Sequence, residues 1–387
     1  MLLRPYAIVV DGRLEHGLEA LFDDEGRLKE LRPHTGNSEP FVLSAAFINA
    51  HSHLEYRGLM GEIPETDYHS WILAITAKKV AQSEARVRED CLLAAAENRA
   101  TGVAFIAEHS DRPYSGEAMT KNGLDGVIFQ ELITIADRED TAQRLEFVTQ
   151  NLLKTTSEFS GEVHINPHAP WTVDTQSLKN LAAIGGKVSI HVAESVYENE
   201  LFLHGKGPLA TVCKEFGMQL PTGQRVVGYL KDCGLLRKDV QFVHVCDISG
   251  EEAEVIARAG VAVAHCPRSN EALNCPRAPV RDMLDAGVLV GLGLDSAASS
   301  GPIDMFAEMR AALRVSRERG TPVTPEEVWR MATSMGAQSL GLGEWDVAPG
   351  SDAPMIKIHI QDAEDIEELM ALASPEKTEW LKDEIPN

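Results

Sequence analysis

The sequence predicts an α/β protein built on a (β/α)8 TIM barrel, with a smaller β-domain formed by both ends of the chain. Three observations support this fold class. Eight short apolar runs alternate with helical patterns through the middle of the chain. Strand-and-turn patterns occupy the first forty-odd residues and return after residue 340. Polar or ionisable residues end nearly every one of the eight runs, and a TIM barrel assembles its active site at those strand ends.

The two chain ends share a strand-and-turn pattern. The first begins "YAIVVDGRLE" and "LEALFDDEGRLKEL", where Asp-Gly and Glu-Gly turn signals separate short apolar runs, as in antiparallel hairpins. After residue 340, "GLGEWDVAPGSDAPMIKIHI" has the same texture, and we expect it to pair with the first segment. We therefore predict one small domain from residues 1–44 and 343–387, the latter ending in a solvated acidic helix and tail. Residues 45–342 are expected to form the barrel.

The eight expected strands lie within about 250 residues, which is the size of a (β/α)8 barrel. Segments with helix-like spacing, such as "EARVREDCLLAAAENRATG", separate them. In chain order the strands are expected at "AAFINAH", "GVAFIAEH", "GVIFQELI", "EVHINPH", "KVSIHVAE", "QFVHVCD", "VAVAHCP" and "VLVGLGLD".

Composition narrows the class of partner. The chain has 387 residues and a formal net charge of −23, which argues against nucleic acid and anionic membrane surfaces. No apolar run reaches the roughly 18 residues of a membrane span. The six cysteines are scattered without a CxxC pair, as in reduced cytoplasmic proteins. We therefore expect a cytoplasmic protein that acts on a small molecule, and the sequence leaves a homodimer open.

A metal site is predicted from the strand ends. In "FINAHSHLEYRG", His51 and His53 stand two residues apart, so strand alternation directs both imidazoles to one face. Alone, this pair is equally consistent with polar turn residues. However, His191 and Asp295 stand at the ends of two other expected strands, and loose histidines would not keep that phase. Three imidazole nitrogens and a carboxylate suit zinc or a similar divalent ion, which can lower the pKa of a water toward neutrality.

Two further residues are candidates for the chemistry. Glu194 follows His191 by three residues, beyond the strand end, where it can act as general acid and base; the alternative is a solvated carboxylate at a helix start. His244 ends the strand between two ligand-bearing ones, from which it can hydrogen-bond the activated water or a developing oxyanion. Asp295, next to that water, can assist as both ligand and base.

These runs resemble a known superfamily of enzymes. The runs "FINAHSHLE", "INPHAPWTVD", "SIHVAES", "FVHVCD", "AHCPRSNEAL" and "VGLGLDS" resemble the amidohydrolases, in particular their cytosine-deaminase-like and chlorohydrolase-like branch. The resemblance covers most of the chain, from about residue 40 to about residue 350. It implies that the barrel is distorted and that the two chain ends form a β-sandwich.

The resemblance also implies a set of site residues. A single metal would be held by the positions His51, His53, His191 and Asp295. Glu194 resembles the family's proton-shuttling glutamate, His244 the histidine beside the attacking water, and His168 a position that usually touches the substrate. The fourth strand, "EVHINPHAP", lacks the carboxylated lysine of binuclear members. One divalent ion is therefore expected, with Zn2+ the first choice and Fe2+ accepting the same ligands.

The implied activity is hydrolytic deamination. The loop "HLEYRGLMGEIPETDYHSWI" and the runs "FQELI" and "CPRSNEAL" most resemble aminodeoxyfutalosine deaminases. That resemblance implies conversion of 6-amino-6-deoxyfutalosine to futalosine plus ammonia, in menaquinone biosynthesis. Other adenosine derivatives, pterins, guanine-like bases and the substrates of a triazine-type chlorohydrolase or small-amide hydrolase remain alternatives. A catalytically dead barrel is disfavoured because the ligands, Glu194 and His244 are all retained.

Two more residues are expected to bind the substrate. Trp71, in "DYHSWILAI", can close over a flat ring, although a tryptophan at a helix start can also belong to the core. Arg268, in "HCPRSN", follows the seventh strand, and its planar guanidinium could hold a substrate carboxylate at the pocket mouth. The alternative for Arg268 is a structural salt bridge that pins the loop.

Overall fold

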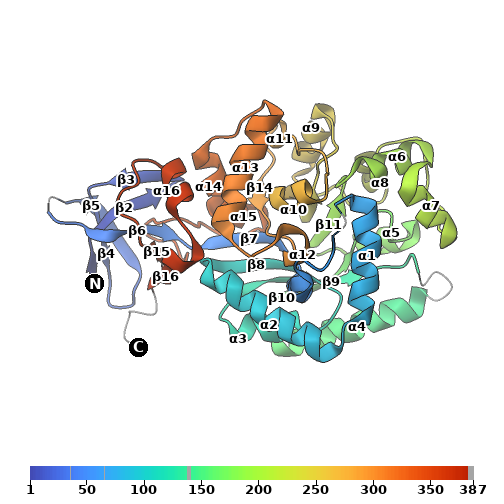
Figure 1. Ribbon diagram of the computed structural model, residues 1–387, viewed down its shortest axis with the longest axis horizontal. Helices are drawn as coiled ribbons and strands as arrows, with labels where there is room; N and C mark the ends of the chain where they lie inside the picture. Colours follow the sequence, from blue (N-terminus) through green and yellow to red (C-terminus); the bar gives the residue numbers. More distant parts are fainter. Residues whose placement is uncertain (35, 65, 137–140, 382–387) are drawn as a thin grey trace.

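Two four-stranded parallel sheets form the centre of the larger domain in the computed structural model, which describes residues 1–34, 36–64, 66–136 and 141–381 (Figure 1). Their strand orders are β10-β9-β8-β7 and β11-β12-β13-β14. The strands are β7 (Phe47–Ser52), β8 (Val103–Ser110), β9 (Asp125–Leu132), β10 (Glu162–Pro167), β11 (Val188–Val192), β12 (Val240–His244), β13 (Ala262–His265) and β14 (Val290–Leu292). Each coincides with one of the runs expected from the sequence.

The two sheets meet at both edges, so the eight strands enclose a barrel with two distorted seams. At the first seam a single bridge joins Ser52 to Asp295, whose backbone N–H donates to the carbonyl of His51 at 2.9 Å. At the second, between β10 and β11, the backbone N–H of His191 donates to the carbonyl of His168 at 3.1 Å, and a side chain supplies two further hydrogen bonds. The Oδ1 of Asn166 accepts from the backbone N–H of Ser189 at 2.8 Å, and its amide donates to the Ser189 carbonyl. The expected distorted (β/α)8 barrel is confirmed.

Helices cover the outside of the barrel (Figure 1). They are α1 (Tyr68–Ala81), α2 (Glu84–Ala100), α3 (Ser115–Lys121), α4 (Thr141–Glu158), α5 (Thr175–Ile184), α6 (Val196–His204), α7 (Gly207–Glu215), α8 (Val226–Asp232), α9 (Gly250–Ala259), α10 (Pro267–Ala272), α11 (Val280–Asp285), α12 (Ala297–Ser300), α13 (Met305–Arg319), α14 (Pro325–Ala332) and α15 (Ser334–Ser339). Side chains that satisfy the first free N–H groups set several helix starts: Asp67 accepts from the N–H of Ser70 at the start of α1. Among the described residues, no helix has the length and apolarity needed to cross a membrane.

Both chain ends contribute to a smaller domain made of two sheets. One has the order β1 (Leu2–Leu3), β4 (Leu18–Phe22), β5 (Leu28–Pro33). The other has the order β16 (Thr378–Trp380), β15 (Met355–Ile358), β6 (Glu39–Ala45), β2 (Pro5–Val10), β3 (Arg13–His16). A buried cluster that includes Ile8, Phe22 and Leu43 joins the sheets, as in a sandwich. Asp11 and Gly12, at φ of 48° and 75°, form the turn between β2 and β3.

The acidic C-terminal segment is more embedded than expected from its charge. Helix α16 (Ile366–Leu372) buries Ile366, Leu369 and Met370, and a short 3-10 helix (Pro375–Lys377) then leads into β16, which pairs with β15. The expectation of a solvated helix is therefore wrong for the inner face of α16, because apolar residues recur there at helical spacing. The end of the predicted tail, residues 382–387, lies outside the described residues.

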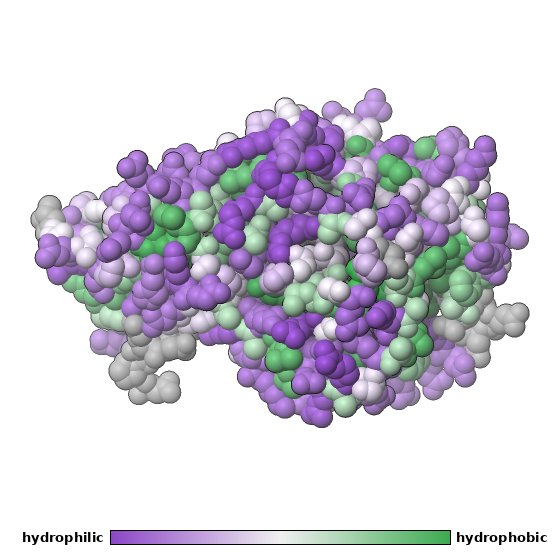
Figure 2. All heavy atoms as spheres, in the orientation of Figure 1, coloured by the Kyte–Doolittle hydropathy of each residue, from purple (hydrophilic) through white to green (hydrophobic). Residues whose placement is uncertain are grey.

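Most of the face drawn in Figure 2 is hydrophilic, in keeping with the net charge. Hydrophobic residues gather on the right of that view, around the region where Figure 1 draws α1, α5 and α7. This region borders the cavity described next.

Candidate metal centre and active site

Strained backbone marks the carboxyl ends of the barrel strands. Of the six non-glycine residues with positive φ in the described chain, four lie at or just after the ends of β11, β12 and β14. They are Ala193 (49°), His244 (73°), Val245 (51°) and Asp295 (53°). A β-branched valine in this region is a clear outlier, and such strain persists only where the surroundings hold it in place. The strain aims the side chains of His244 and Asp295, both of which line the cavity.

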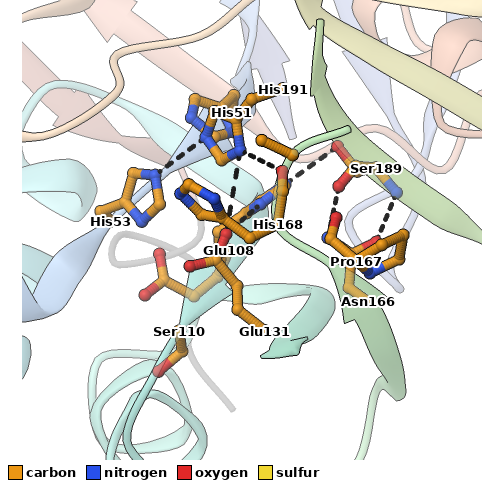
Figure 3. Close-up of polar contacts among 12 residues, drawn as sticks. His51, His53, Glu108, Ser110, Glu131, Asn166, Pro167, His168, Ser189 and His191 are labelled. Atoms are coloured by element: carbon orange, nitrogen blue, oxygen red, sulfur yellow. Dashed lines mark hydrogen bonds and ion pairs between the residues drawn. The ribbon is translucent and has the colours of Figure 1, made fainter. Parts of the chain in front are cut away.

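Three of the expected metal ligands are imidazoles that face one another at the strand ends (Figure 3). The Nε2 atoms of His53 and His191 lie 3.3 Å apart. The Nε2 of His51 lies 3.5 Å from Oδ1 of Asp295, and the Nε2 of His53 lies 3.8 Å from the same oxygen. The structure thus brings together all four residues that the sequence singles out for the metal.

These separations are those of ligands around one small ion. Tetrahedral coordination at about 2.0–2.1 Å places ligand atoms about 3.3–3.4 Å apart, because the tetrahedron edge is about 1.6 times the ligand distance. The observed 3.3 Å between His53 and His191 matches that edge, and the two distances to Asp295 exceed it by a few tenths of an ångström. Side chains in this arrangement could hold a divalent cation with little movement.

The unpartnered ring nitrogens of the cluster fit the chemistry of metal ligands. Within the described chain, both ring nitrogens of His51 and the Nδ1 of His53 are buried without a hydrogen-bond partner. Buried polar atoms are rarely left without a partner, and coordination to a cation would satisfy these nitrogens. The Nδ1 of His191 is 2.8 Å from the carbonyl of His168, to which it donates, so its Nε2 presents a lone pair toward the cluster. Burial by itself raises the pKa of Asp295, but the neighbouring imidazoles of His51, His244 and His53 outweigh burial and hold that pKa well below its usual range.

Glu194 and His244 stand beside this cluster. The carboxylate of Glu194 is buried, and its Oε2 lies 3.6 Å from the Nε2 of His244. The Nδ1 of His244 is 2.8 Å from Oδ1 of Asn270, which fixes the proton on Nδ1 and leaves Nε2 as an acceptor. Burial raises the pKa of Glu194 well above its usual value and lowers the pKa of His244 to about 4. A proton can therefore reside on Glu194 beside a neutral imidazole.

The turn after β11 is held by a second carboxylate. The backbone N–H of Glu194 donates to Oε1 of Glu198, four residues later, at 2.9 Å. Glu198 is itself buried, and burial raises its pKa to about 8. This contact fixes the start of α6 and with it the direction in which Glu194 leaves the strand.

A buried polar layer packs beneath the imidazoles. The ring of His109 lies edge-on to His51 with centroids 4.4 Å apart. Its Nδ1 is 3.3 Å from Oε1 of Glu131, and its Nε2 is 2.9 Å from Oγ of Ser189. This layer restricts how far His51 can rotate, which preserves the geometry of the cluster.

The cluster opens into a cavity of about 670 Å³. Helix α1 forms one wall, with Tyr68, Trp71 and Ile75 turned inward at helical spacing. Trp71 and His168 both line the cavity, as expected for residues that touch the substrate. The Nδ1 of His168 is 2.9 Å from Oγ1 of Thr172, so its other ring nitrogen is left for a ligand.

Apolar side chains also line the outer part of the cavity, although they are exposed to solvent. The lining residues Leu73, Val80, Phe147 and Phe216 have exposed fractions of 49%, 73%, 41% and 50%. A ligand that reaches this rim would cover apolar surface that water now contacts.

Arg268 is the one expected substrate contact that the structure does not bring to the cavity. Its Nη1 donates to the carbonyl of Pro302 at 2.8 Å and lies 3.8 Å from Oε2 of the buried Glu308. Its backbone N–H donates to the other oxygen of Glu308 at 3.0 Å. In the structure Arg268 therefore joins α10, the short helix after β13, to α13 and the segment before it, which corresponds to the structural alternative that its position in the sequence left open.

Several cavity residues escaped the sequence-based search. Among them are Tyr56, Lys79 and Asp111, which come from the 3-10 helix after β7 (Leu54–Leu59), from α1 and from the position just after β8. Asp111 has a weak signal, since it stands two residues after His109 in the same phase. Tyr56 and Lys79 have none, because helical segments lack the strand phase that identified the other residues.

The chain resembles known proteins in sequence and in fold. Residues 42–375 match the amidohydrolase family. The 5-methylthioadenosine/S-adenosylhomocysteine deaminase of Thermococcus onnurineus is 29% identical over 317 residues, which cover 78% of this chain and 70% of the relative. The structure of Helicobacter pylori aminofutalosine deaminase in complex with methylthio-coformycin superposes with a TM-score of 0.81 at 16% identity, covering 98% of this chain and 99% of that one. For the adenosine deaminase from Xanthomonas campestris with bound zinc, the TM-score is 0.80 at 19% identity, covering 97% and 90%.

Proposed function

The chain belongs to the amidohydrolase family, and on that premise we propose that it is a metal-dependent deaminase of an adenine nucleoside. It is an enzyme that hydrolyses carbon–nitrogen bonds. The observation that carries the proposal is the position of Glu194 and His244, which are 3.6 Å apart beside a cluster of candidate metal ligands in one cavity. A ring amine needs an activated water and a proton source for its removal, and this arrangement offers both.

One divalent ion would be held by His51, His53, His191 and Asp295. Zinc is the first choice from the donor set of three nitrogens and one carboxylate, and iron(II) accepts the same ligands. When bound, such an ion acts as a Lewis acid and lowers the pKa of a water toward neutrality.

Glu194 moves the protons in this proposal. It takes a proton from the attacking water and gives it to N1 of the purine, which makes C6 electrophilic, so that addition of the oxygen at C6 can break the aromaticity of the ring. The oxygen adds to C6, and the remaining proton passes through Glu194 to the departing amine, so water and substrate yield the 6-oxo purine and ammonia. The neutral Nε2 of His244 accepts a hydrogen bond from the hydroxyl on C6 and steadies the tetrahedral centre.

The side chains that line the cavity fit a flat heteroaromatic substrate. Trp71 and Ile75 of α1 offer apolar surface for a purine ring, and His168 offers a ring nitrogen at its edge. The exposed apolar rim favours a nucleoside whose 5′-substituent is itself largely apolar. Our best assignment, from the loop "HLEYRGLMGEIPETDYHSWI" and this rim, is 6-amino-6-deoxyfutalosine, converted to futalosine in menaquinone biosynthesis.

A second substrate is favoured by the curated relatives. The relative from Thermococcus onnurineus is named as a deaminase of 5-methylthioadenosine and S-adenosylhomocysteine. The methylthio group is also small and apolar, so the same rim would accept it. Both candidates share the adenine ring and the ribose, and they differ only beyond the 5′ carbon.

Release of ammonia from aminated purines, nucleosides and pterins tests the function. The purified protein, analysed for zinc and iron in the same preparation, should release ammonia from adenine nucleosides and should act fastest on those with an apolar 5′-substituent. Chloride release from a chlorotriazine, without ammonia release from any nucleoside, would instead assign the chlorohydrolase alternative.

A further inference from the structure

An ion pair is built into the wall of the cavity, away from the expected metal ligands. The Nζ of Lys79, on α1, donates to Oδ2 of Asp111 at the end of β8. Side-chain exposure is 23% for Lys79 and 12% for Asp111. The hydroxyl of Tyr56 donates to the same oxygen of Asp111 at 3.2 Å and lies 3.4 Å from Nζ of Lys79. Three elements thus converge to place a charged pair inside the cavity.

This pair stands about one tyrosine's length from the candidate metal centre. The ring of Tyr56 stacks on the ring of His53, with centroids 5.2 Å apart and planes at 27°. The hydroxyl at the far end of that ring contacts Asp111. A purine with C6 near the cluster would direct its sugar away from His53 by a similar length, into the part of the cavity that Lys79 and Asp111 line.

One oxygen of the pair lacks a donor. The Oδ2 of Asp111 accepts from both Lys79 and Tyr56, whereas its Oδ1 is buried without a hydrogen-bond partner in the described chain. Leaving a carboxylate oxygen in this state is costly, and a hydroxyl of a bound ligand would relieve that cost. The ammonium of Lys79, in turn, has three N–H donors, which exceed the two oxygens it contacts.

The charges of Lys79 and Asp111 determine which functional groups of a ligand can bind to the pair. Lys79 and Asp111 neutralise one another, so the pair offers an acceptor beside a donor without net charge. A carboxylate or phosphate placed against the Oδ1 of Asp111 would be repelled by that carboxylate, although Arg112 and Arg144 also line the cavity. A hydroxyl both donates and accepts, and two neighbouring hydroxyls of a sugar can use both halves of the pair.

We propose that Lys79 and Asp111 form the subsite that recognises the ribose 2′,3′-diol of the nucleoside. This inference rests on the proposed function and extends it from the base to the sugar. The pair then rejects nucleosides without these hydroxyls, because they leave the buried Oδ1 of Asp111 unpaired in the complex as well. Lys79 and Asp111 are specificity residues that act on binding, and they take no part in the proton transfers of Glu194.

The test compares adenosine with 2′,3′-dideoxyadenosine in metal-analysed wild type and in Asp111→Asn and Lys79→Met. Glu117→Gln is the matched control, because Glu117 has 13% side-chain exposure and a lysine partner but lies outside the cavity. We expect wild type to prefer adenosine by about 10²-fold in kcat/KM, since hydrogen bonds to charged groups are each worth about 10- to 100-fold. Asp111→Asn should lower kcat/KM for adenosine by at least about 10-fold, mainly through KM, and change the dideoxy substrate by less than about 3-fold. Glu117→Gln should change neither.

Other outcomes separate the two proposals. An equal loss on both nucleosides, or no loss on adenosine, would overturn the diol subsite and leave the pair structural. If wild type releases no ammonia from any adenine nucleoside, including those with an apolar 5′-substituent, the proposed function fails. The subsite is then judged by calorimetry with inosine and 2′,3′-dideoxyinosine on the same folded variants. Tighter binding of inosine that Asp111→Asn abolishes supports it, and equal binding of the two overturns it.

Discussion

Glu194 and His244 reach the cavity from two different strands, and the Oε2 of the first lies 3.6 Å from the Nε2 of the second. A hydrogen bond holds each of these two residues in place. Glu198 accepts from the backbone N–H of Glu194, and Asn270 holds the Nδ1 of His244. A water oxygen bound between them would contact Glu194, which can carry its protons, and the Nε2 of His244, which can accept a hydrogen bond. Addition of water to a ring carbon requires both kinds of group.

Glu194→Gln should separate chemistry from folding. Glutamine keeps the size of the side chain but cannot carry the proton, so turnover should fall by at least about 10²-fold while the metal content and melting temperature stay near those of wild type. Steady-state ammonia release and metal analysis on one preparation measure both effects. Near-normal turnover in a metal-replete Glu194→Gln protein would move the proton-transfer role to another residue.

His191→Ala should remove both bound metal and activity. The imidazole of His191 contributes one of three nitrogens, and its Nε2 is 3.3 Å from that of His53, so its loss opens the cluster on one side. Elemental analysis of the purified variant measures occupancy directly. Full occupancy in His191→Ala would rule out the four-ligand assignment.

Chelation provides the reversible counterpart for the wild type. Prolonged dialysis against a chelator should abolish ammonia release, and stoichiometric zinc or iron(II) should restore it. The ion that restores the higher kcat identifies the better cofactor. Activity that survives complete metal removal would contradict metal dependence without reference to any variant.

Strand periodicity explains why the barrel could be predicted. Buried parallel strands are continuous apolar runs, and their ends follow one geometric rule, so that "SIHVAES" locates β11, His191 and Glu194 together. The same rule places His51 and Asp295 on neighbouring edges, where the bridge between Ser52 and Asp295 closes the first seam. The catalytic and ligand roles of these residues stay predictions until the variants above are measured.

Side chains from loops and helices obey no such rule, and there the sequence is a weaker guide. In the sequence, Lys79 has the same pattern as a solvent-exposed lysine on a helix. Only the folded structure shows that its ammonium contacts Asp111. Arg268 follows a strand end, yet its guanidinium donates to the carbonyl of Pro302 and lies 3.8 Å from the buried Glu308, and it does not line the cavity. The direction of a long side chain after a strand end depends on tertiary partners that periodicity cannot reveal.

Arg268→Met should therefore affect stability and leave substrate selectivity unchanged. Removing the guanidinium leaves Glu308 buried with only the backbone N–H of residue 268, and we expect the free energy of unfolding to fall by about 1–3 kcal/mol. The ratio of kcat/KM for a carboxylated adenine nucleoside to that for adenosine should stay within about 2-fold of wild type. Denaturant unfolding and the two rate measurements check these expectations. A selective loss on the carboxylated substrate would restore Arg268 as an anchor that reaches the cavity on binding.

Glu117 allows a test of acid sensitivity far from the cavity. Its carboxylate accepts from Arg88 at 2.6 Å and from Lys121 at 2.6 Å, and these hydrogen bonds lower its pKa from the usual 4.5 to about 2. A carboxyl group whose pKa is lower in the folded state stabilises the fold above its unfolded pKa and loses that contribution as the pH falls through its folded pKa. Because Arg88 and Lys121 are about half exposed, solvent screening limits the contribution to about 1 kcal/mol.

Glu117→Gln should accordingly be less stable than wild type by about 1 kcal/mol at pH 7. The difference should shrink below pH 4.5 and vanish as the pH falls below about 2, where wild-type Glu117 becomes protonated and no longer pairs with Arg88. Urea unfolding of both proteins at several pH values, followed by circular dichroism, measures the difference directly. A gap between the two proteins that is constant from pH 7 to pH 3 would show that the glutamine acts through packing between α2 and α3, independently of the charge on Glu117.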